Sequence, residues 1–230
     1  MHLYIGNKLY SSWSLRPWLA MTGCGISFDE TVIPLFDEAF KARVAEVSDA
    51  GLVPVLVDGD IKVWETLAII EYVAERFPEN AVWPVDVAAR AHARSISSEM
   101  HAGFSGLRSV CPMNLGKRFA RRDRGEDVAR DAKRTCAIVG EARTRFGQLG
   151  AGPFLYGAFS AADAMYAPLM TRLDTYDIEV DGVTRTYIDA LLGCESLQTW
   201  LGAALKEEWI VAEDEVDEPA IENLRPHLAG

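Results

Sequence analysis

The sequence predicts an α/β N-terminal domain with a mixed four-stranded sheet, followed by an all-α helical bundle domain. Strand-like and helix-like apolar patterns alternate as far as Pro78. Pro78 and Pro84 then break the periodicity before Asp86. Beyond this break the long apolar patterns have helical spacing. We therefore expect a first domain over residues 1–78, a linker over 79–86 and a helical domain over 87–230, in a chain long enough to bury a sizeable core.

The first half of the N-terminal domain has the pattern of a βαβ unit, in which a helix connects two strands of one sheet. Ser14 is suited to cap that helix, and Pro17 to stand in its first turn, where a backbone N–H is not needed. The expected elements are a strand over 2–6, a polar loop over 7–14, a helix through Trp18, Leu19 and Met21 that ends near Gly23 or Gly25, a strand over 28–34 and a weaker helix over 37–48.

The second half of this domain is the stretch 51–78, GLVPVLVDGDIKVWETLAIIEYVAERFP. Asp58-Gly59 is a strong signal for a two-residue hairpin, and it joins an apolar strand over 55–57 to a returning strand over 61–64. A helix with a broad apolar face follows at once and ends at Pro78. The resulting order of strand, helix, strand, helix, hairpin and helix is that of a thioredoxin-like domain.

The second domain is expected to be helical throughout, with one looser segment and an acidic tail. Ser160 and Asp163 stand three residues apart before an apolar run, which is the pattern of a capping box at a helix start. The expected elements are helices over 86–110, 126–149, 184–193 and 195–206, a helix that begins at Ser160, a loop over 111–125 that borders the active site, and a tail over 207–230 that packs across the first domain or is partly frayed.

Composition excludes several classes of protein. The net charge of −11 argues against nucleic acid and anionic membrane as partners, because both repel an acidic surface. No apolar run is long enough to span a bilayer, and the N-terminus has no secretory signal, so we expect a cytoplasmic protein. The four cysteines form no C-x-x-C pair and the four histidines have no metal-ligand spacing. We therefore expect no metal and no redox dithiol.

The residues of the stretch 51–78 point to a ligand with an amine, a carboxylate and a peptide backbone. Glu65 can accept hydrogen bonds from an ammonium group, while Thr66 and the first-turn N–H groups of the helix can hold a carboxylate. A cis bond between Val53 and Pro54 would leave the Val53 backbone free to pair with an extended peptide. These are the recognisable parts of glutathione.

The pattern V-P-V-L-x-D-G-x-x-x-W-E-T-x-A-I-I-E-Y strongly resembles the thioredoxin-like domain of glutathione S-transferases. Gly157 and the box at Ser160 and Asp163 resemble the start of the central buried helix of the C-terminal domain in that family. The resemblance implies that Val53, Pro54, Glu65 and Thr66 bind glutathione. It assigns Asp163 a folding role.

The segment Ser11-Ser12-Trp13-Ser14-Leu15-Arg16 resembles the S-S-C-x-W-R motif of zeta-class transferases. In that class a serine hydroxyl stabilises the glutathione thiolate, the form that acts as the nucleophile. The resemblance makes Ser11 the first candidate for this catalytic role and Ser12 the second. Arg16 is then structural, at the interface between domains, and Ser14 caps the helix.

Two departures from the family pattern affect the expected chemistry. Trp13 replaces the cysteine of the zeta motif, so it is expected to form a wall of the second-substrate pocket, and isomerisation of the maleylacetoacetate type is in doubt. Leu52 stands where the family often has a lysine for the glycyl carboxylate, so Lys41 or another cation would have to substitute. The rest of the second pocket is expected from Met100, Phe104, Leu107 and Arg108, although such an apolar stripe is also typical of a core.

The sequence thus predicts a cytoplasmic, homodimeric glutathione transferase that serves in detoxification. Glutathione is its co-substrate, and the reaction is conjugation of a small electrophile or glutathione-dependent isomerisation. A non-catalytic protein of the same fold that binds a ligand or a protein remains the alternative. A thioredoxin-like reductase is disfavoured because residues 7–16 contain no cysteine.

Overall fold

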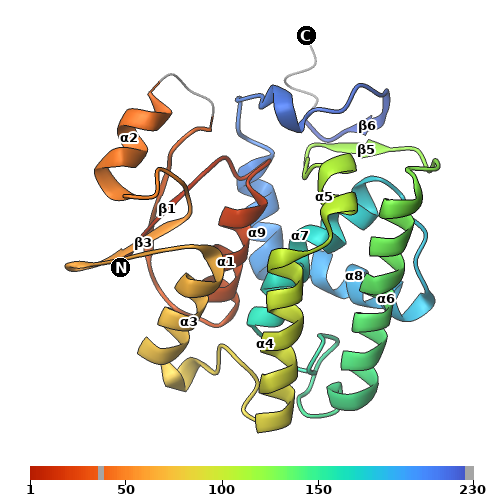
Figure 1. Cartoon of the computed structure of the whole chain (residues 1–230), viewed down its shortest axis with the longest axis horizontal. Helices are drawn as coiled ribbons and strands as arrows, with labels where there is room; N and C mark the ends of the chain where they lie inside the picture. The colour runs from red at the N-terminus through yellow and green to blue at the C-terminus, as the bar shows by residue number, and fades with distance from the viewer. Residues whose placement is uncertain (36–38, 226–230) are drawn as a thin grey trace.

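A computed structural model describes residues 1–35 and 39–225 of the chain. An α/β part that begins at the N-terminus lies beside a helical part, and the two are in contact along their length (Figure 1). The sheet has the order β2-β1-β3-β4, with β1 parallel to β2 and antiparallel to β3, and β3 antiparallel to β4. This confirms the predicted mixed four-stranded sheet. Its strands are β1 (His2–Ile5), β2 (Asp29–Val32), β3 (Val55–Asp58) and β4 (Ile61–Trp64).

The helices of the α/β part are α1 (Ser12–Gly23), α2 (Phe40–Val47) and α3 (Thr66–Arg76), followed by the 3₁₀ turn η1 (Pro78–Asn80). Residues 36–38, at the start of the helix predicted over 37–48, lie outside the described residues. The prediction that Ser14 caps the first helix is wrong. Helix α1 begins at Ser12 with Ser11 as its N-cap, three residues before the predicted cap, and Ser14 Oγ instead accepts the Gly6 N–H at 2.9 Å. Pro17 consequently lies in the second turn.

The helical part contains α4 (Val87–Ala102), α5 (Ser105–Val110), α6 (Glu126–Phe146), α7 (Ala161–Thr175), α8 (Gly182–Leu192) and α9 (Glu195–Ala204). The single helix predicted over 86–110 is wrong, because the chain breaks between α4 and α5. Gly103 is extended, and Phe104 has a left-handed backbone with φ of +57°. Glycine is a weak helix former, and here a Cβ at Gly103 would come within 2.8 Å of the Glu99 carbonyl oxygen.

The C-terminal tail is partly a strand. Within the segment predicted as a loop, β5 (Lys117–Phe119) pairs antiparallel with β6 (Ala220–Asn223) of the tail. Both lie at the top of the helical part in Figure 1. The tail also contacts the α/β part, since Glu207 accepts hydrogen bonds from the Lys8 and Leu9 N–H groups at 2.7 and 3.1 Å. The prediction that the tail packs across the first domain is therefore confirmed for Glu207. It is wrong for β6, which pairs with β5 of the helical part.

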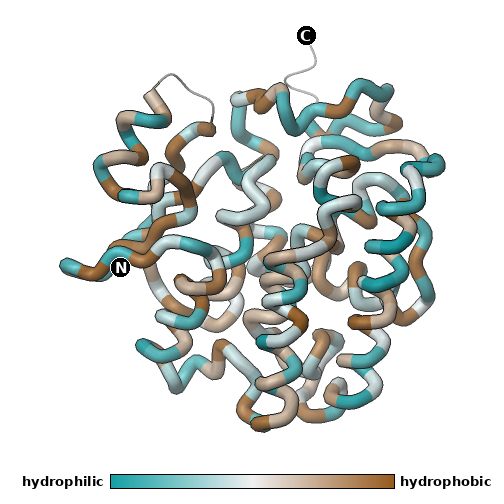
Figure 2. The backbone as a smooth tube through the Cα atoms, viewed as in Figure 1, coloured by the Kyte–Doolittle hydropathy of each residue, from teal (hydrophilic) through white to brown (hydrophobic). Residues whose placement is uncertain are grey.

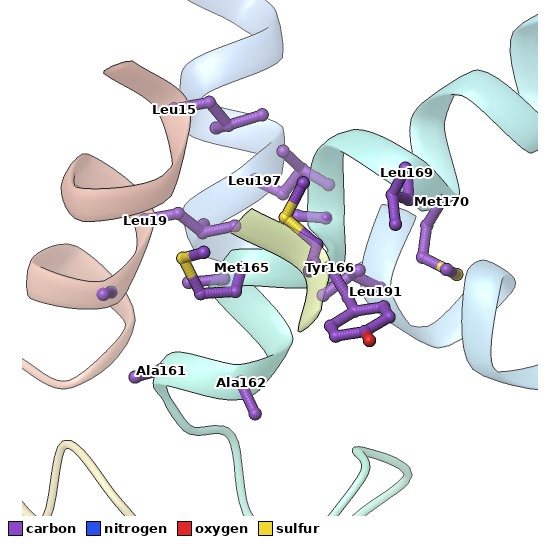
Figure 3. Close-up of a cluster of buried hydrophobic side chains, with 14 of the residues drawn as sticks. Leu15, Leu19, Ala161, Ala162, Met165, Tyr166, Leu169, Met170, Leu191 and Leu197 are labelled. Atoms are coloured by element: carbon purple, nitrogen blue, oxygen red, sulfur yellow. The ribbon is translucent and has the colours of Figure 1, made fainter. Parts of the chain in front are cut away.

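The two parts share a core formed by α1 and α7. Leu19 of α1 lies beside Met165 of α7, and Leu15 of α1 and Leu197 of α9 belong to the same buried cluster (Figure 3). Helix α7 is buried along nearly its whole length, as its apolar sequence requires. In contrast, hydrophilic residues recur along α6 at the edge of the molecule (Figure 2). The shared core fixes the N-terminal end of α1 at the junction of the two parts.

The start of α7 is held by the predicted capping box. Asp163 is fully buried, and its carboxylate accepts four hydrogen bonds, from the Leu155 and Ser160 N–H groups and the Ser160 and Tyr187 hydroxyls. These bonds tie the loop before α7 and helix α8 to one side chain. The structure thus confirms the capping box and gives Asp163 contacts that fit its expected folding role.

Replacing Asp163→Asn should lower the free energy of unfolding by about 2–4 kcal/mol, because one oxygen acceptor becomes an NH₂ that faces two donors. Chemical denaturation with a two-state fit measures this. The matched control is Asp86→Asn at the start of α4, where Asn caps a helix as well as Asp and the change should be small. Equal losses in the two variants would contradict this role of Asp163.

Candidate functional site

Two cavities meet at the side chain of Trp13. The first, which we call the Pro54 cavity, has a volume of about 220 Å³ and is lined by Trp13, Leu52, Val53, Pro54, Trp64, Glu65 and Thr66. The second, the Ser12 cavity, has a volume of about 420 Å³ and is lined by Tyr10, Ser11, Ser12, Trp13, Leu35, Ser105, Arg108, Ser109, Arg172 and Asp214. All four predicted glutathione-binding residues therefore line one cavity, and both candidate serines line the other.

The Pro54 cavity offers backbone groups to an extended ligand. The peptide bond between Val53 and Pro54 is cis, which is the condition on which the expected backbone pairing of Val53 depends. Within the part of the chain that the structure describes, the N–H and C=O of Val53 have no hydrogen-bond partner, and β3 begins only at Val55. An extended peptide can therefore pair with Val53 without displacing another strand.

Glu65 forms the other end of this cavity, at the start of α3. It is the N-cap residue and has a φ of +68°, a conformation that non-glycine residues adopt rarely and that is found at functional sites. No side chain of residues 1–35 or 39–225 caps α3, so the first-turn N–H groups are available to a ligand at the positive end of the helix dipole. The cavity thus places an exposed carboxylate beside N–H donors.

The hydroxyl of Thr66, which was predicted to be a donor for a ligand carboxylate, has a partner within the protein. It donates to the Trp13 carbonyl oxygen at 2.9 Å. In a regular helix that oxygen would accept the N–H of the residue four positions later, which here is Pro17 and has none. Thr66 therefore completes α1 across the domain, and a ligand carboxylate has the backbone N–H groups of α3 rather than this hydroxyl as donors.

The indole of Trp13 separates the two cavities and is surrounded by cationic and aromatic groups. The guanidinium carbon atoms of Arg16 and Arg108 lie 4.4 and 4.7 Å from the ring centroid. The His101 ring is 5.0 Å away, and His101 Nε2 is 3.9 Å from a Glu65 carboxylate oxygen. His101 was not predicted from the sequence, and no local pattern marks it, because its partners are distant in the chain.

The two candidate serines differ in their hydrogen bonds. Ser11 is buried, and its hydroxyl donates to Ser14 Oγ at 2.8 Å. Ser12 is half-buried, and its oxygen lies 3.5 Å from Arg172 Nη2 as an acceptor. Both stand where α1 begins, and α1 has no side-chain cap. Each serine can therefore offer a proton to an anion at this end of the helix.

Three arginines near these serines have only neutral partners among the described residues. Arg16 donates to the Met165 and Ser12 carbonyls, which confirms its predicted place between the domains. Arg172 donates to the Cys111 and Pro168 carbonyls, and Arg108 to the Gly103 carbonyl. Burial, with help from the neighbouring charges, lowers the pKa of Arg16 well below its usual value and that of Arg172 to about 10. The site thus has positive charge that no carboxylate of the described chain neutralises within 4.0 Å.

Arg172 was also missed, although the sequence contains a signal for it. It is the one basic residue in the mainly apolar stretch that forms α7, and an arginine is rarely fully buried unless it is paired. Asp214 in the C-terminal tail was missed as well. Its segment is acidic throughout, so nothing distinguishes this residue from its neighbours.

Part of the predicted second-substrate pocket is core. Met100, Phe104 and Leu107 are buried and do not line the Ser12 cavity, whereas Trp13 and Arg108 do. The reason is the break at Gly103, which turns α5 so that Ser105, Arg108 and Ser109 face the cavity. Leu52 lines the Pro54 cavity and Lys41 does not. No cation lines that cavity among the described residues.

Neither a metal centre nor a membrane span is found in residues 1–35 and 39–225. No three His, Cys, Asp or Glu side chains of this part are grouped so that they could hold a metal ion. None of its helices is both long and apolar enough to cross a bilayer.

Comparison with known proteins finds a family that matches the part of the chain that lines the Pro54 cavity. Residues 10–76 match the family described as "Glutathione S-transferase, N-terminal domain". A probable maleylacetoacetate isomerase of Caenorhabditis elegans is 34% identical over 112 residues, 46% of this chain and 52% of that protein. A zeta-class glutathione S-transferase of Euphorbia esula is 27% identical over 47% of this chain and 50% of its own. The chain thus spans about half the length of the curated relatives it matches.

Solved structures extend the similarity in fold to most of the chain. A glutathione transferase homolog from Burkholderia, crystallised with bound glutathione, has a TM-score of 0.66 over 88% of this chain and 96% of its own, at 19% identity. A glutathione transferase from Populus trichocarpa has a TM-score of 0.64 over 88% of this chain and 98% of its own, at 17% identity. At these identities the comparison shows a shared fold.

The variant Thr66→Val should lower the free energy of unfolding by about 1–3 kcal/mol, because it leaves the Trp13 carbonyl without a donor in a partly buried place. Thr66→Ser, which keeps the hydroxyl, should stay much closer to the unsubstituted protein. The control is Thr186→Val on the exposed side of α8, where the lost hydroxyl bond is replaced by water. A Thr66→Val protein as stable as the control would show that this hydrogen bond contributes nothing to joining α1 and α3.

Proposed function

We propose that this chain is a glutathione transferase, because its residues 10–76 match the N-terminal domain of the glutathione S-transferase family and its fold is similar to that of solved glutathione transferases. Glutathione binds in the Pro54 cavity, and its thiolate attacks a small electrophile in the Ser12 cavity. The observation that carries the proposal is the Pro54 cavity itself. It combines an unpaired backbone at Val53, the carboxylate of Glu65 and the open N-terminus of α3 in one lining.

Each of these groups matches one part of the tripeptide. Glu65 accepts from the ammonium group of the γ-glutamyl residue, and the first-turn N–H groups of α3 hold its carboxylate. The Val53 backbone pairs with the cysteinyl backbone. The glycyl carboxylate finds no cation in the lining, where Leu52 stands instead, and this favours modest affinity for glutathione.

The thiolate is stabilised at the start of α1. A negative sulfur is a stronger acceptor than a neutral hydroxyl, so the Ser11 hydroxyl turns from Ser14 Oγ and donates its hydrogen bond to the sulfur. Ser14 Oγ still accepts a hydrogen bond from the Gly6 N–H. Ser12 is the second candidate donor. The α1 dipole and the charges of Arg16, Arg108 and Arg172 act in the same direction, since nearby cations lower a thiol pKa.

The second substrate is a small electrophile in the Ser12 cavity, and the unpaired charges of Arg108 and Arg172 favour one that carries an anionic group. The reaction is conjugation or glutathione-dependent isomerisation. Both begin with attack of the same thiolate on the electrophile, and they differ in whether the sulfur stays bound to the product or leaves it again. If glutathione does not bind, the alternative hypothesis is favoured, in which the chain is a non-catalytic protein of this fold that binds a ligand or a protein.

We also propose that the protein is a cytoplasmic homodimer that serves in detoxification. The four cysteines are free, which supports the reducing cytoplasm as the location and fits a role in detoxification. The groove along α3 and α4, with Trp83 in its lining and the exposed Val85 at its edge, supports a homodimer. Sedimentation equilibrium of the purified protein tests the dimer, and a single species of 25.4 kDa would exclude it.

Calorimetric titration with glutathione is the first test of the function. We expect binding in the range of micromolar to millimolar Kd, and a loss of about fivefold in Glu65→Gln, because an exposed ion pair contributes roughly 1 kcal/mol. The control is Glu79→Gln in η1, after the opposite end of α3, which should bind like the unsubstituted protein. An absence of glutathione binding would leave the non-catalytic alternative.

The second test is the ultraviolet titration of the bound thiol. We expect the thiol pKa of glutathione bound to the protein to be lower than that of free glutathione. The variant Ser11→Ala should reverse much of that shift and reduce the rate with a model electrophile by about 10- to 100-fold. Ser12→Ala should have a smaller effect on both. The control is Ser95→Ala, which changes an exposed side chain of α4. A Ser11→Ala protein with unchanged thiol pKa and rate would remove Ser11 from this role.

A further inference from the structure

Asp214 is the only carboxylate among the described residues that line the Ser12 cavity. It ends the 3₁₀ turn η2 (Ala212–Asp214) of the C-terminal tail and is about half-buried. Its side chain makes no hydrogen bond and no ion pair with any residue in 1–35 or 39–225. A carboxylate in this setting is available to a ligand.

The opposite charge in the same cavity is equally unpaired. Arg172 and Arg108 line it and have only carbonyl or hydroxyl partners in the part of the chain that is described. Arg172 influences the Asp214 carboxylate electrostatically, yet no nitrogen and oxygen of the two lie within 4.0 Å. The cavity therefore holds a cationic and an anionic group with a gap between them, which a ligand with two different ends can fill.

The tail is anchored on both sides of Asp214, so the position of this carboxylate is defined. The neighbouring Glu215 accepts from the Tyr10 hydroxyl at 2.7 Å, from Asn114 at 3.0 Å and from Lys117 at 2.6 Å. On the other side, Glu207 is bound to the Lys8 and Leu9 N–H groups. These bonds hold the tail against the loop before α1.

We propose that Asp214 makes the Ser12 cavity selective for electrophiles that carry one carboxylate and one hydrogen-bond donor, and that it discriminates against dicarboxylates. The proposal rests on the proposed function, which supplies the thiolate. The substrate carboxylate binds Arg108 and Arg172, and the donor group binds Asp214. A second carboxylate would instead lie beside Asp214, where like charges repel in a partly desolvated place.

The selectivity should depend on pH. Burial raises the pKa of Asp214 to about 6, the charges of Glu213 and Glu215 act in the same direction, and Arg172 opposes them. The other groups that share the cavity are Arg108 on α5 and Tyr10 before α1, which stay protonated near neutral pH. Below about pH 6 Asp214 becomes neutral, so its repulsion of a second carboxylate is lost while the arginines keep their charge.

Fumaramate and fumarate form a matched pair of substrates, since they differ by an amide in place of one carboxylate. The glutathione thiolate adds to the C=C bond of either. The S–C bond forms, the π pair moves to the adjacent carbon, and that carbon takes a proton from solvent. The measured quantity is the ratio of kcat/KM for fumaramate to that for fumarate, divided by the same ratio for the uncatalysed reaction.

At neutral pH we expect this corrected ratio to be at least about 30 in the unsubstituted protein and to fall by about tenfold or more in Asp214→Asn, whose amide can donate to a carboxylate. Glu213→Gln, an exposed neighbour, should stay within about twofold. At about pH 5.5 the ratio of the unsubstituted protein should approach that of the variant. A ratio that is unchanged in Asp214→Asn and insensitive to pH would overturn the proposal and leave the proposed function standing.

Binding without turnover separates the two hypotheses. Succinamate and succinate cannot react with a thiol, and calorimetry can measure their affinities for the protein with and without glutathione. A preference for succinamate that disappears in Asp214→Asn and in Asp214→Ala supports the proposal, even in a protein that shows no conjugation. Equal affinities for both in all variants would overturn it. Thermal unfolding verifies that the variants are folded, which we expect because the Asp214 side chain makes no hydrogen bond with the described residues.

Discussion

The burial of α1 against α7 is the constraint on which the rest of the site depends. Leu15, Leu19 and Met165 belong to one buried cluster, and the fully buried Arg16 donates to the Met165 carbonyl. Removing a guanidinium from water is costly, and here no carboxylate compensates it in the described chain. The charge of Arg16 therefore remains available at the start of α1, where it acts on whatever lies beside Ser11, Ser12 and Trp13.

A missing N–H in α1 joins the two halves of the site. Pro17 cannot donate to the Trp13 carbonyl, and Thr66 supplies the donor from the start of α3. The same bond therefore fixes Trp13, which separates the cavities, and the first residue of the helix that faces the Pro54 cavity. The Thr66 hydroxyl was expected to contact a ligand carboxylate, but this bond already engages its proton.

Features with a local physical cause could be predicted from the sequence. The Asp58-Gly59 hairpin and the box at Asp163 depend on residues that are near one another in the chain, and the structure contains both. Met100 and Phe104 were misplaced because an apolar stripe at helical spacing does not tell a core from a cavity wall. The break at Gly103 decides which of these side chains are core and which line the cavity. It depends on the left-handed backbone of Phe104 and on the close approach of Gly103 to the Glu99 carbonyl, and neither is visible in the periodicity of the sequence.

Features created by contacts between distant residues could not be predicted, and the charges of the Ser12 cavity are of this kind. The chain has 34 acidic and 23 basic residues, so an acidic partner is available in number for every arginine. Yet Arg16, Arg108 and Arg172 have neutral partners among the described residues, and the one acid in the lining, Asp214, comes from a tail held by Glu207 and Glu215. The fold thus keeps cations and carboxylate apart in one cavity, where mutual neutralisation would have been the simpler outcome for an acidic chain. Unpaired charges of both signs are unfavourable in an empty site and become favourable only with a ligand between them.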